Sequence, residues 1–178
     1  MDDATRFSRE IKSNYAFLAK SIFDLHCLIQ SQSEELYLEK ELGFPVWSSS
    51  TLLLLSRVKS ASIMEISKGL NLSHQLTSQR IKMLLKLELI QGVPDANDKR
   101  RTIYHLTSKG KDKSKILELY CLDAAHAFKD LSDEIGFDIQ LVMNSAIAAL
   151  SKKTFSERFP DNLIPYEKRI TKGKKDEK

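Results

Sequence analysis

The sequence predicts a mainly α-helical protein that carries one small β-hairpin. Three observations indicate this fold class. Apolar residues recur at spacings of three, four and seven over long segments, which is the period of an amphipathic helix. Only 6 Gly and 4 Pro occur in 178 residues, which argues against a turn-rich all-β sandwich. Two short runs, residues 89–93 and 101–106, have strand character and flank a turn-forming segment.

An amphipathic helix is expected near the N-terminus, over residues 5–30. Its apolar stripe consists of Phe7, Ile11, Leu18, Ile22, Leu25 and Ile29. At ~1.5 Å of rise per residue this helix is about 40 Å long, which is more than one small domain can cover, so it needs a partner helix. The sequence Gly43-Phe44-Pro45 then breaks the chain, and residues 47–58 are expected to form a short, largely buried helix.

Residues 62–87 show the pattern of a helix-turn-helix. Ser62 and Glu65 fit a capping box, which begins a short helix that ends near Asn71. Its inward residues are expected to be Ile63, Ile66 and Leu70. Ser73 is the second N-cap candidate, for a helix to about Leu87. The inward positions of this second helix are expected to be Leu76, Thr77, Ile81, Leu84 and Leu85, and its outward ones His74, Gln75, Ser78, Gln79 and Lys82.

A β-hairpin is expected directly after this helix pair. Its strands are residues 89–93 and 101–106, and a hairpin in this position of a helix-turn-helix is a wing. The tip carries Lys99, Arg100 and Arg101, a cationic group that is suited to phosphates or to a narrow minor groove.

Two further helices are expected in the last third of the chain. Thr107 caps a long one, whose apolar positions are Leu117, Cys121, Ala124, Ala125, Phe128 and Leu131. Gly136 breaks it, and residues 139–150 form a last amphipathic helix. Residues 167–178 are rich in Lys and are expected to be a frayed tail.

The net charge of +4 is unevenly distributed along the chain. Residues 57–115 carry 13 basic and 5 acidic side chains, whereas residues 1–56 carry 5 and 8, and residues 116–178 carry 10 and 11. A basic middle segment is typical of a protein that binds a polyanion. A solvated surface of mixed charge fits the same count, so the motifs have to decide between the two.

Several classes of protein are disfavoured. The run Leu52–Leu55, like every other apolar run in the sequence, is far shorter than the roughly 20 residues of a membrane span, and the N-terminus lacks the features of a signal peptide. Two cysteines cannot form a disulfide framework, so we expect a cytoplasmic protein with no membrane partner. The sequence lacks a phosphate-binding Gly loop, a nucleophile elbow and a paired His/Glu metal motif. We therefore expect no enzyme, no cofactor and no metal.

The expected wing resembles that of a known family. The stretch Asp95-Ala96-Asn97-Asp98-Lys99-Arg100-Arg101, followed by Leu106-Thr107-Ser108-Lys109-Gly110, is similar to the wing signature of the MarR family of bacterial winged-helix transcriptional regulators. Residues 73–90 are similar to the recognition helix of that family, and the resemblance covers about residues 5–150. Glu88 departs from it, because the family usually has Gly there, and Met83 and Leu85 make the recognition helix more apolar than usual.

The resemblance implies a winged helix-turn-helix lobe with long N- and C-terminal dimerisation helices. It implies a sequence-specific DNA-binding regulator, a repressor in our interpretation, that acts as a homodimer on a pseudo-palindromic operator. The expected domains are a dimerisation helix over residues 1–34, a DNA-binding lobe over 35–110, dimerisation helices over 111–155 and a basic tail over 156–178.

The expected DNA contacts lie on the second helix and on the wing. Gln75 and Gln79 share a helix face, and their amides suit adenine in the major groove. Arg100 is expected to enter the minor groove, held by a bidentate pair with Asp98, whose other possible role is turn formation. The full set is Ser73, His74, Gln75, Ser78, Gln79, Arg80, Lys82, Asp98, Lys99, Arg100 and Arg101.

The resemblance also suggests an effector. Members of the family often bind small phenolic or lipophilic compounds, so a small aromatic or lipophilic effector is expected here. The candidate pocket residues are Tyr15, Phe17, Phe44 and Trp47, although aromatic residues at helical spacing also fit a plain core. Cys27 and Cys121 are expected to be buried, inert thiols. The alternative function is a winged-helix module that binds a protein partner; the polar outer face of the second helix favours DNA.

Overall fold

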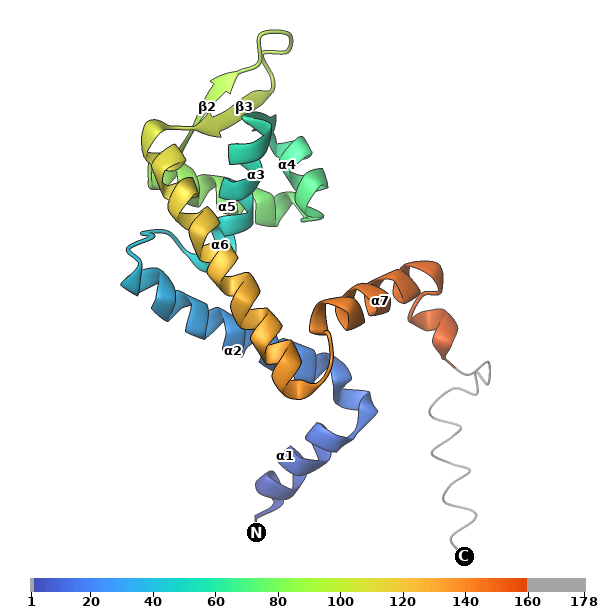
Figure 1. Cartoon of the computed structure of the whole chain (residues 1–178). Helices are drawn as coiled ribbons and strands as arrows, with labels where there is room; N and C mark the ends of the chain where they lie inside the picture. The colour runs from blue at the N-terminus through green and yellow to red at the C-terminus, as the bar shows by residue number, and fades with distance from the viewer. Residues whose placement is uncertain (1, 160–178) are drawn as a thin grey trace, which may run out of the picture. The chain divides into compact units, whose positions relative to one another are not determined.

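The computed structural model of the chain describes residues 2–159 (Figure 1). The chain divides into two compact units, Met1–Asp123 and Ala124–Lys178. The helices of the first unit are α1 (Asp3–Ser13), η1 (Tyr15–Phe17), α2 (Leu18–Glu39), η2 (Val46–Ser48), α3 (Ser49–Val58), α4 (Ile63–Leu70) and α5 (His74–Lys86). Its strands are β1 (Ser60–Ser62), β2 (Ile90–Pro94) and β3 (Thr102–Leu106). Helix α6 (Ser108–Ile135) begins in the first unit and ends in the second, which also contains α7 (Ile139–Lys152) and η3 (Ser156–Arg158).

The prediction of one continuous helix over residues 5–30 is wrong. The chain leaves the helix at Asn14, because the side chain of Asn14 accepts a hydrogen bond from the backbone N–H of Ala16 at 2.9 Å and so stabilises a turn instead. The second helix of this segment, α2, continues well beyond the predicted end, to Glu39. Much of the expected apolar stripe is exposed in the single chain, notably Phe7, Leu18, Ile22 and Leu25.

The core of the first unit lies where α3, α4, α5 and the sheet meet. Its buried apolar residues include Leu52, Leu55, Ile66, Ile81, Leu84, Leu89, Leu106 and Leu117. An aromatic cluster extends this core to the end of α2, because Tyr37 packs edge-on against Phe44 and Tyr120 at ring-centroid distances of 5.7 and 4.8 Å. The ammonium group of Lys113 also donates a hydrogen bond to the carbonyl oxygen of Glu41. The first half of α6 and the end of α2 are therefore in contact with each other.

The capping prediction for the helix-turn-helix is confirmed. The hydroxyl of Ser62 accepts from the N–H of Glu65, and the Glu65 carboxylate accepts from the N–H of Ser62 at 2.7 Å, which is a complete capping box. Asn71 ends α4 in the left-handed conformation, and the Ser73 hydroxyl then caps α5 by accepting from the N–H of Leu76 at 3.2 Å.

Two inward positions predicted for α5 are wrong. Thr77, Ile81 and Leu84 are buried as expected, but Leu76 and Leu85 are exposed. Residues 77, 81 and 84 follow one line along the helix, whereas residues 76 and 85 lie about 100° to either side of that line. The surfaces that pack against α5 cover only the central line.

The sheet has one strand more than the predicted hairpin. Its order is β1-β3-β2, and both pairs are antiparallel. Strand β2 pairs with β3 from Ile90 opposite Leu106 to Pro94 opposite Thr102, which confirms the hairpin. Strand β1, which was not predicted, pairs on the other side of β3, with Ser60 opposite His105. The strand that leads into α4 is therefore bonded directly to the wing.

The start of α6 is fitted closely against the turn between α5 and β2. Thr107 caps α6 by accepting from the N–H of Gly110 at 3.0 Å, and its hydroxyl donates to the carbonyl oxygen of Glu88 at 2.7 Å. A Cβ atom on Gly110 would lie 1.9 Å from the carbonyl oxygen of Leu89, so only glycine fits. Glu88 itself has a φ of +57°, which is the left-handed conformation. That conformation explains why a glycine suits the position where this chain has Glu88.

The second unit begins within α6 and carries much exposed apolar surface. Gly136, at a φ of +73°, ends α6 as predicted, and the Asp138 carboxylate caps α7 by accepting from the N–H of Leu141 at 2.8 Å. The exposed apolar side chains of this unit include Phe128, Ile135, Phe137, Leu141, Val142, Ile147 and Leu150. The predicted tail over residues 167–178, and residues 160–178 of the predicted basic segment, lie outside the described residues.

Among residues 2–159, no helix combines the length and the apolar character that a membrane span requires.

Candidate nucleic-acid interface

The N-terminal half of α5 presents a polar surface to solvent. His74, Gln75, Gln79 and Lys82 are all exposed, and the last three follow one another at spacings of four and three, on one face of the helix. The partial positive charge of a helix N-terminus is also located here. This surface combines neutral amides with cationic groups, which suits hydrogen bonding to base edges and to phosphates.

Two other predicted contact residues on α5 are less accessible. Ser78 is half-buried. Arg80 is also half-buried, and its guanidinium donates a hydrogen bond to the hydroxyl of Ser50 at 2.7 Å, which connects α5 to α3. This burial lowers the pKa of Arg80 from its ordinary value. Arg80 thus has a structural contact within the lobe that the spacing of polar residues does not reveal.

Exposed apolar side chains lie next to the polar surface of α5. Leu76 is 47% exposed, and Met64, in the first turn of α4, is 72% exposed. Sequence reasoning missed both. The prediction that Leu76 faces inward is wrong, because the angular position of residue 76 lies beside the buried line of α5 rather than on it.

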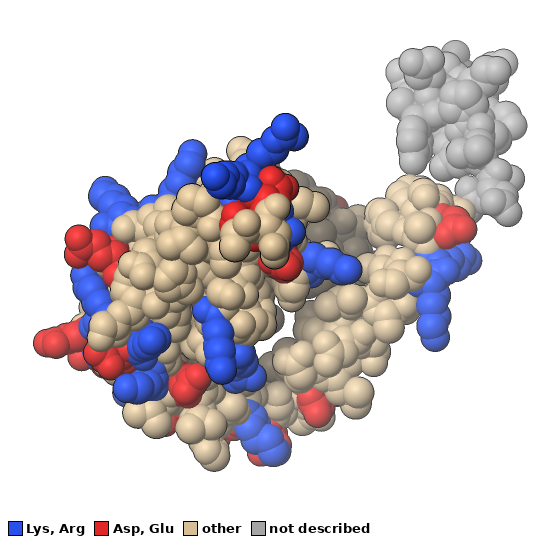
Figure 2. Space-filling view, turned by 90° about the horizontal axis from the view of Figure 1, so that it is seen from above, with Lys and Arg blue, Asp and Glu red and all other residues tan. Residues whose placement is uncertain are grey.

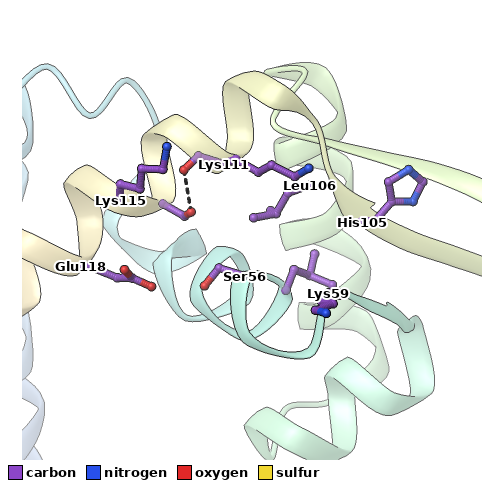
Figure 3. A pocket seen from close by; sticks show the side chains of 9 residues that line it. Ser56, Lys59, His105, Leu106, Lys111, Lys115 and Glu118 are labelled. Carbon is purple, nitrogen blue, oxygen red and sulfur yellow. Dashed lines mark hydrogen bonds between the residues drawn. The ribbon is translucent and has the colours of Figure 1, made fainter.

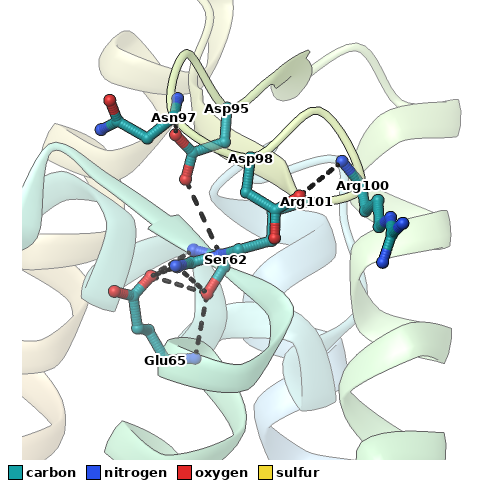
Figure 4. Close-up of polar contacts among 7 residues, drawn as sticks. All are labelled: Ser62, Glu65, Asp95, Asn97, Asp98, Arg100 and Arg101. Carbon is teal, nitrogen blue, oxygen red and sulfur yellow. Dashed lines mark hydrogen bonds and ion pairs between the residues drawn. The ribbon is translucent and has the colours of Figure 1, made fainter.

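The wing tip is held by its own polar side chains. The Asp95 carboxylate accepts from the N–H of Asn97 at 2.9 Å, and the Asp98 carboxylate accepts from the backbone N–H of Arg100 at 3.0 Å. These are Asx turns, which stabilise the loop locally. The predicted bidentate pair between Asp98 and the Arg100 guanidinium is wrong, because Asp98 bonds the main chain of Arg100 while the side chain of Arg100 points away (Figure 4).

Arg101, which was expected to contact DNA, extends in the opposite direction from Arg100 (Figure 4). Its guanidinium lies 3.5 Å from the Glu65 carboxylate and 3.7 Å from the Asp95 carboxylate, and it donates to the Ser62 hydroxyl at 3.3 Å. Hydrogen bonds from Ser62 and, to a lesser degree, the charge of Arg101 lower the pKa of Glu65. Arg101 is therefore engaged with the capping box of α4, whereas among residues 2–159 Arg100 has no ion-pair partner.

Basic side chains surround this end of the lobe. In Figure 2, which looks down on the molecule from above, Lys and Arg project from many points of the near face, with acidic side chains at several places among them. This distribution agrees with the excess of 13 basic over 5 acidic residues in the segment 57–115. Such a surface attracts a polyanion without being uniformly positive.

The predicted effector residues do not come together in the single chain. Phe44 is buried in the core, where it packs against Tyr37, and Trp47 is half-buried in η2. Tyr15 is 91% exposed and precedes α2, and Phe17 packs on Phe7 at a ring-centroid distance of 6.1 Å. The 22 residues of α2 separate the two pairs along the chain, a helix length of about 33 Å.

A groove that the sequence did not reveal lies between α3, β3 and α6 (Figure 3). Its volume is about 520 Å³, and it is lined by Leu55, Ser56, Lys59, His105, Leu106, Lys111, Ser114, Lys115 and Glu118. Two leucines form apolar lining, and three lysines outnumber the single carboxylate. The spacing of four that places Lys111 and Lys115 on one face of α6 is visible in the sequence. The position of Lys59 beside them results only from the packing of α3 and the sheet, which the sequence does not reveal. A groove of this composition can hold a small organic anion.

The two cysteines differ from the expectation of burial, since Cys27 and Cys121 are both exposed in the single chain. Partial burial still raises the pKa of the Cys121 thiol, and the charge of Arg57 opposes this effect. In the part of the chain that the structure describes, three or more His, Cys, Asp or Glu side chains do not gather into a group that could hold a metal ion.

Comparison with known proteins agrees with this geometry. The model of the MarR family matches residues 42–101, which include the helix-turn-helix and most of the wing. A search of curated protein sequences gives no match. Together with the solved structures below, the family match confirms the resemblance that the wing motif indicates.

Solved structures of low sequence identity share the fold. A MarR family transcription regulator has 17% identity and a TM-score of 0.61, with 86% of this chain and 100% of that chain covered. The adhesin competence repressor AdcR of Streptococcus pyogenes has 19% identity and a TM-score of 0.57, with 76% and 96% covered. The heme sensor protein PefR of Streptococcus agalactiae, in complex with heme, has 19% identity and a TM-score of 0.54, with 80% and 98% covered. The family match and the fold support a DNA-binding transcription regulator.

Proposed function

We propose that this protein is a transcriptional regulator that binds a specific double-stranded DNA sequence. One observation carries the proposal: the exposed polar start of α5 and the exposed cationic tip of the wing belong to the same basic lobe. A helix of this kind can enter the major groove while a hairpin tip reaches the adjacent minor groove.

The residues of α5 are proposed to read bases. Gln75 and Gln79 can each form a bidentate pair with adenine, and the exposed Leu76 beside them can contact a thymine methyl group. Ser73, His74 and Ser78 can bond to bases or phosphates, and Lys82 is placed for a phosphate.

The wing is proposed to contribute affinity and groove shape. Lys99 and Arg100 would approach the minor groove, where a narrow width strengthens the attraction of an arginine. Asp98 would act through the backbone of Arg100, as the turn residue that shapes the tip. Arg80 is proposed to connect α5 to α3 through Ser50 rather than to read bases.

A homodimer is part of the proposal. The exposed apolar side chains of α1 and α2 and those of α6 and α7 would otherwise face water, and a second copy of the chain is the occupant that the family resemblance implies. Two lobes related by a two-fold axis would contact two half-sites about one DNA turn apart, so the operator is expected to be a pseudo-palindrome. Repression would follow where that operator overlaps a promoter.

A small-molecule effector is the second part of the proposal. The groove between α3, β3 and α6 joins an apolar lining to three lysines, so we assign it to a small organic acid rather than to a neutral lipophilic compound. One of the similar structures, PefR, is a complex with heme, but this groove has one histidine and no cysteine, which does not favour an iron ligand set. Screening organic acids for release of bound DNA tests this assignment, and a Lys111→Gln variant should respond more weakly.

One alternative is supported by a specific observation. The exposed Leu76 and Met64 give the helix-turn-helix an apolar element, which a protein partner would favour more than DNA does. The two functions differ in their response to salt, because binding to DNA releases counterions from every neutralised phosphate and therefore weakens steeply as salt rises.

The testing experiment selects duplexes bound by the full-length protein from a pool of random sequence. Gln75→Ala should relax the preference at one base position per half-site, by about 1–3 kcal/mol, while Arg100→Ala should weaken binding to all duplexes. Gln140→Ala on α7 and Arg9→Ala on α1 remove the same chemical groups elsewhere and should leave the selection unchanged. Recovery of no enriched sequence would contradict specific binding, and equal losses for both variants on selected and random duplexes would contradict base reading by Gln75.

A further inference from the structure

We propose that Arg101 is a positioning residue, which fixes the wing to the start of α4 and does not itself contact DNA. The inference rests on the proposed DNA-binding function. The cationic run Lys99-Arg100-Arg101 suggests that all three side chains contact DNA, but under this inference only Lys99 and Arg100 would face the nucleic acid.

The α4 side of this contact is the capping box. The Ser62 hydroxyl donates to the Glu65 carboxylate at 2.7 Å and accepts from the Arg101 guanidinium at 3.3 Å, and the same carboxylate oxygen lies 3.5 Å from the guanidinium. Arg101 thus joins a bonded group that already determines where α4 begins (Figure 4). We call this group, Ser62, Glu65, Asp95 and Arg101, the wing anchor.

The wing side of the anchor is the base of the loop. The N–H of Asp95 donates to the carbonyl oxygen of Arg101 at 2.9 Å, and the N–H of Arg101 donates to the carbonyl oxygen of Asp98 at 2.8 Å. The Asp95 side chain is 15% exposed, and one of its oxygens lies 3.7 Å from the Arg101 guanidinium while the other accepts from Asn97. The same two residues therefore close the loop by their backbones and connect it to α4 by their side chains.

The charges of the anchor explain why Arg101 is a poor DNA contact. Its guanidinium lies between two carboxylates, which offset its charge, and reaching a phosphate would require leaving both. Within residues 2–159, Arg100 has no ion-pair partner, so its charge is available at the tip. The adjacent residues Arg100 and Arg101 would thus have different roles, DNA contact for Arg100 and positioning of the wing for Arg101.

The wing anchor affects DNA binding because α5 and the wing tip must contact the same duplex simultaneously. Helix α5 packs against α4, so the orientation of α4 determines where the base-reading helix lies. By holding α4 to the loop base, the anchor sets the separation between α5 and the wing tip. Pre-setting this separation lowers the ordering cost when both elements bind one duplex.

The test compares Arg101→Gln with its neighbour Arg100→Gln in the full-length protein, on a duplex selected from the random pool. We expect Arg101→Gln to weaken binding roughly three- to tenfold, as the loss of a small ion-pair network suggests, without changing the dependence of affinity on salt. Arg100→Gln should instead lower the salt slope by about 1 for each wing, because it removes a phosphate or groove contact. A drop in the slope for Arg101→Gln equal to that for Arg100→Gln would overturn the inference.

A second variant separates positioning from simple charge. Glu65→Gln keeps the capping box, since glutamine can replace glutamate there, but it removes an anion. Simple electrostatics predicts tighter DNA binding, whereas loss of the anchor predicts weaker binding that Arg101→Gln does not worsen further. Tighter binding by Glu65→Gln would overturn the inference.

A third measurement needs no DNA. In the free protein, Arg101→Gln should accelerate amide hydrogen exchange at positions 95 and 101, whose N–H groups close the loop, while Arg100→Gln should not. Unchanged exchange in Arg101→Gln would refute the anchor even if the protein binds DNA. A wild-type protein that binds no duplex would refute the proposed function, and with it the role of Arg101 in DNA binding, whatever the exchange rates.

Discussion

Replacing Gly110 with alanine should be severely destabilising, although the residue lies in the first turn of a helix, where alanine is normally favourable. The added Cβ would lie 1.9 Å from the carbonyl oxygen of Leu89 and 2.9 Å from its carbonyl carbon, and real Cβ atoms essentially never approach within 3.0 Å. The start of α6 and the turn after α5 would therefore have to separate by about 1 Å or more. Leu89 is buried, so this separation disturbs the core directly.

The cost can be worked out from two contributions. Overpacking of this kind costs about 1–3 kcal/mol. The separation also weakens the bonds by which Thr107 holds the turn, from its N–H to Leu89 at 3.1 Å and from its hydroxyl to Glu88 at 2.7 Å. Each such bond is worth about 0.5–1.5 kcal/mol. We expect a total loss of about 2–6 kcal/mol, which at about 2–4 °C per kcal/mol for a chain of this length lowers the melting temperature by about 4–24 °C.

The assay is thermal or urea unfolding at one fixed protein concentration, because dimerisation would make the midpoint depend on concentration. Two other glycines supply matched controls. Gly69→Ala, within α4, places its Cβ 3.5 Å from Leu54 of α3, which is an ordinary contact, and should be neutral or stabilising by up to about 1 kcal/mol. Gly136→Ala meets no described atom within 4 Å but keeps a φ of +73°, and should cost about 1–2 kcal/mol through strain alone. A wild-type midpoint for Gly110→Ala would refute the reasoning.

Three more outcomes are expected. Asp98→Asn keeps the acceptor for the Arg100 N–H and removes an anion from the wing tip, so it should tighten DNA binding in titrations, with circular dichroism unchanged; weaker binding would favour an orienting role for the charge. Glu88→Gly relieves a φ of +57° and should raise the unfolding free energy by up to about 1 kcal/mol, a gain that Glu39→Gly, in a helix, should not give. The lowered pKa of Glu65 means that its contribution to stability is complete above the ordinary value of 4.5 and is lost as the pH falls through the lower folded value, so Glu65→Gln should flatten the acid limb of melting curves recorded against pH.

The local parts of the fold could be predicted because their chemistry lies within a few residues. Ser62 with Glu65, and Ser73 with the next turn, satisfy N–H groups that any helix start leaves open. The same reasoning failed at Asn14, where the apolar period continues across a residue whose side chain turns the chain. The helical spacing of apolar residues alone cannot reveal such a competing hydrogen bond.

The distant parts could not be predicted because nothing near them in the sequence signals the contact. Strand β1 is the tripeptide Ser60-Ala61-Ser62, which has little strand propensity and becomes a strand only because β3 offers an open edge. At the wing, the sequence predicts an ion pair between the near neighbours Asp98 and Arg100, and this prediction is wrong. The fold instead forms an ion pair between Arg101 and Glu65, which lies in α4 and is 36 residues earlier in the sequence.

The place of β1 in the sheet also has a consequence for how the protein is made. Ser60 acquires its partner, His105, only after the whole helix-turn-helix and hairpin have left the ribosome, since chains emerge from the N-terminus. Helices α4 and α5 need only local contacts and can form earlier, whereas the sheet must wait for a long loop to close. During that interval β1 is an unpaired edge, but its three residues are too few to template pairing with another nascent chain. The shortness of β1 thus protects the growing chain from aggregation at the stage when its sheet is incomplete.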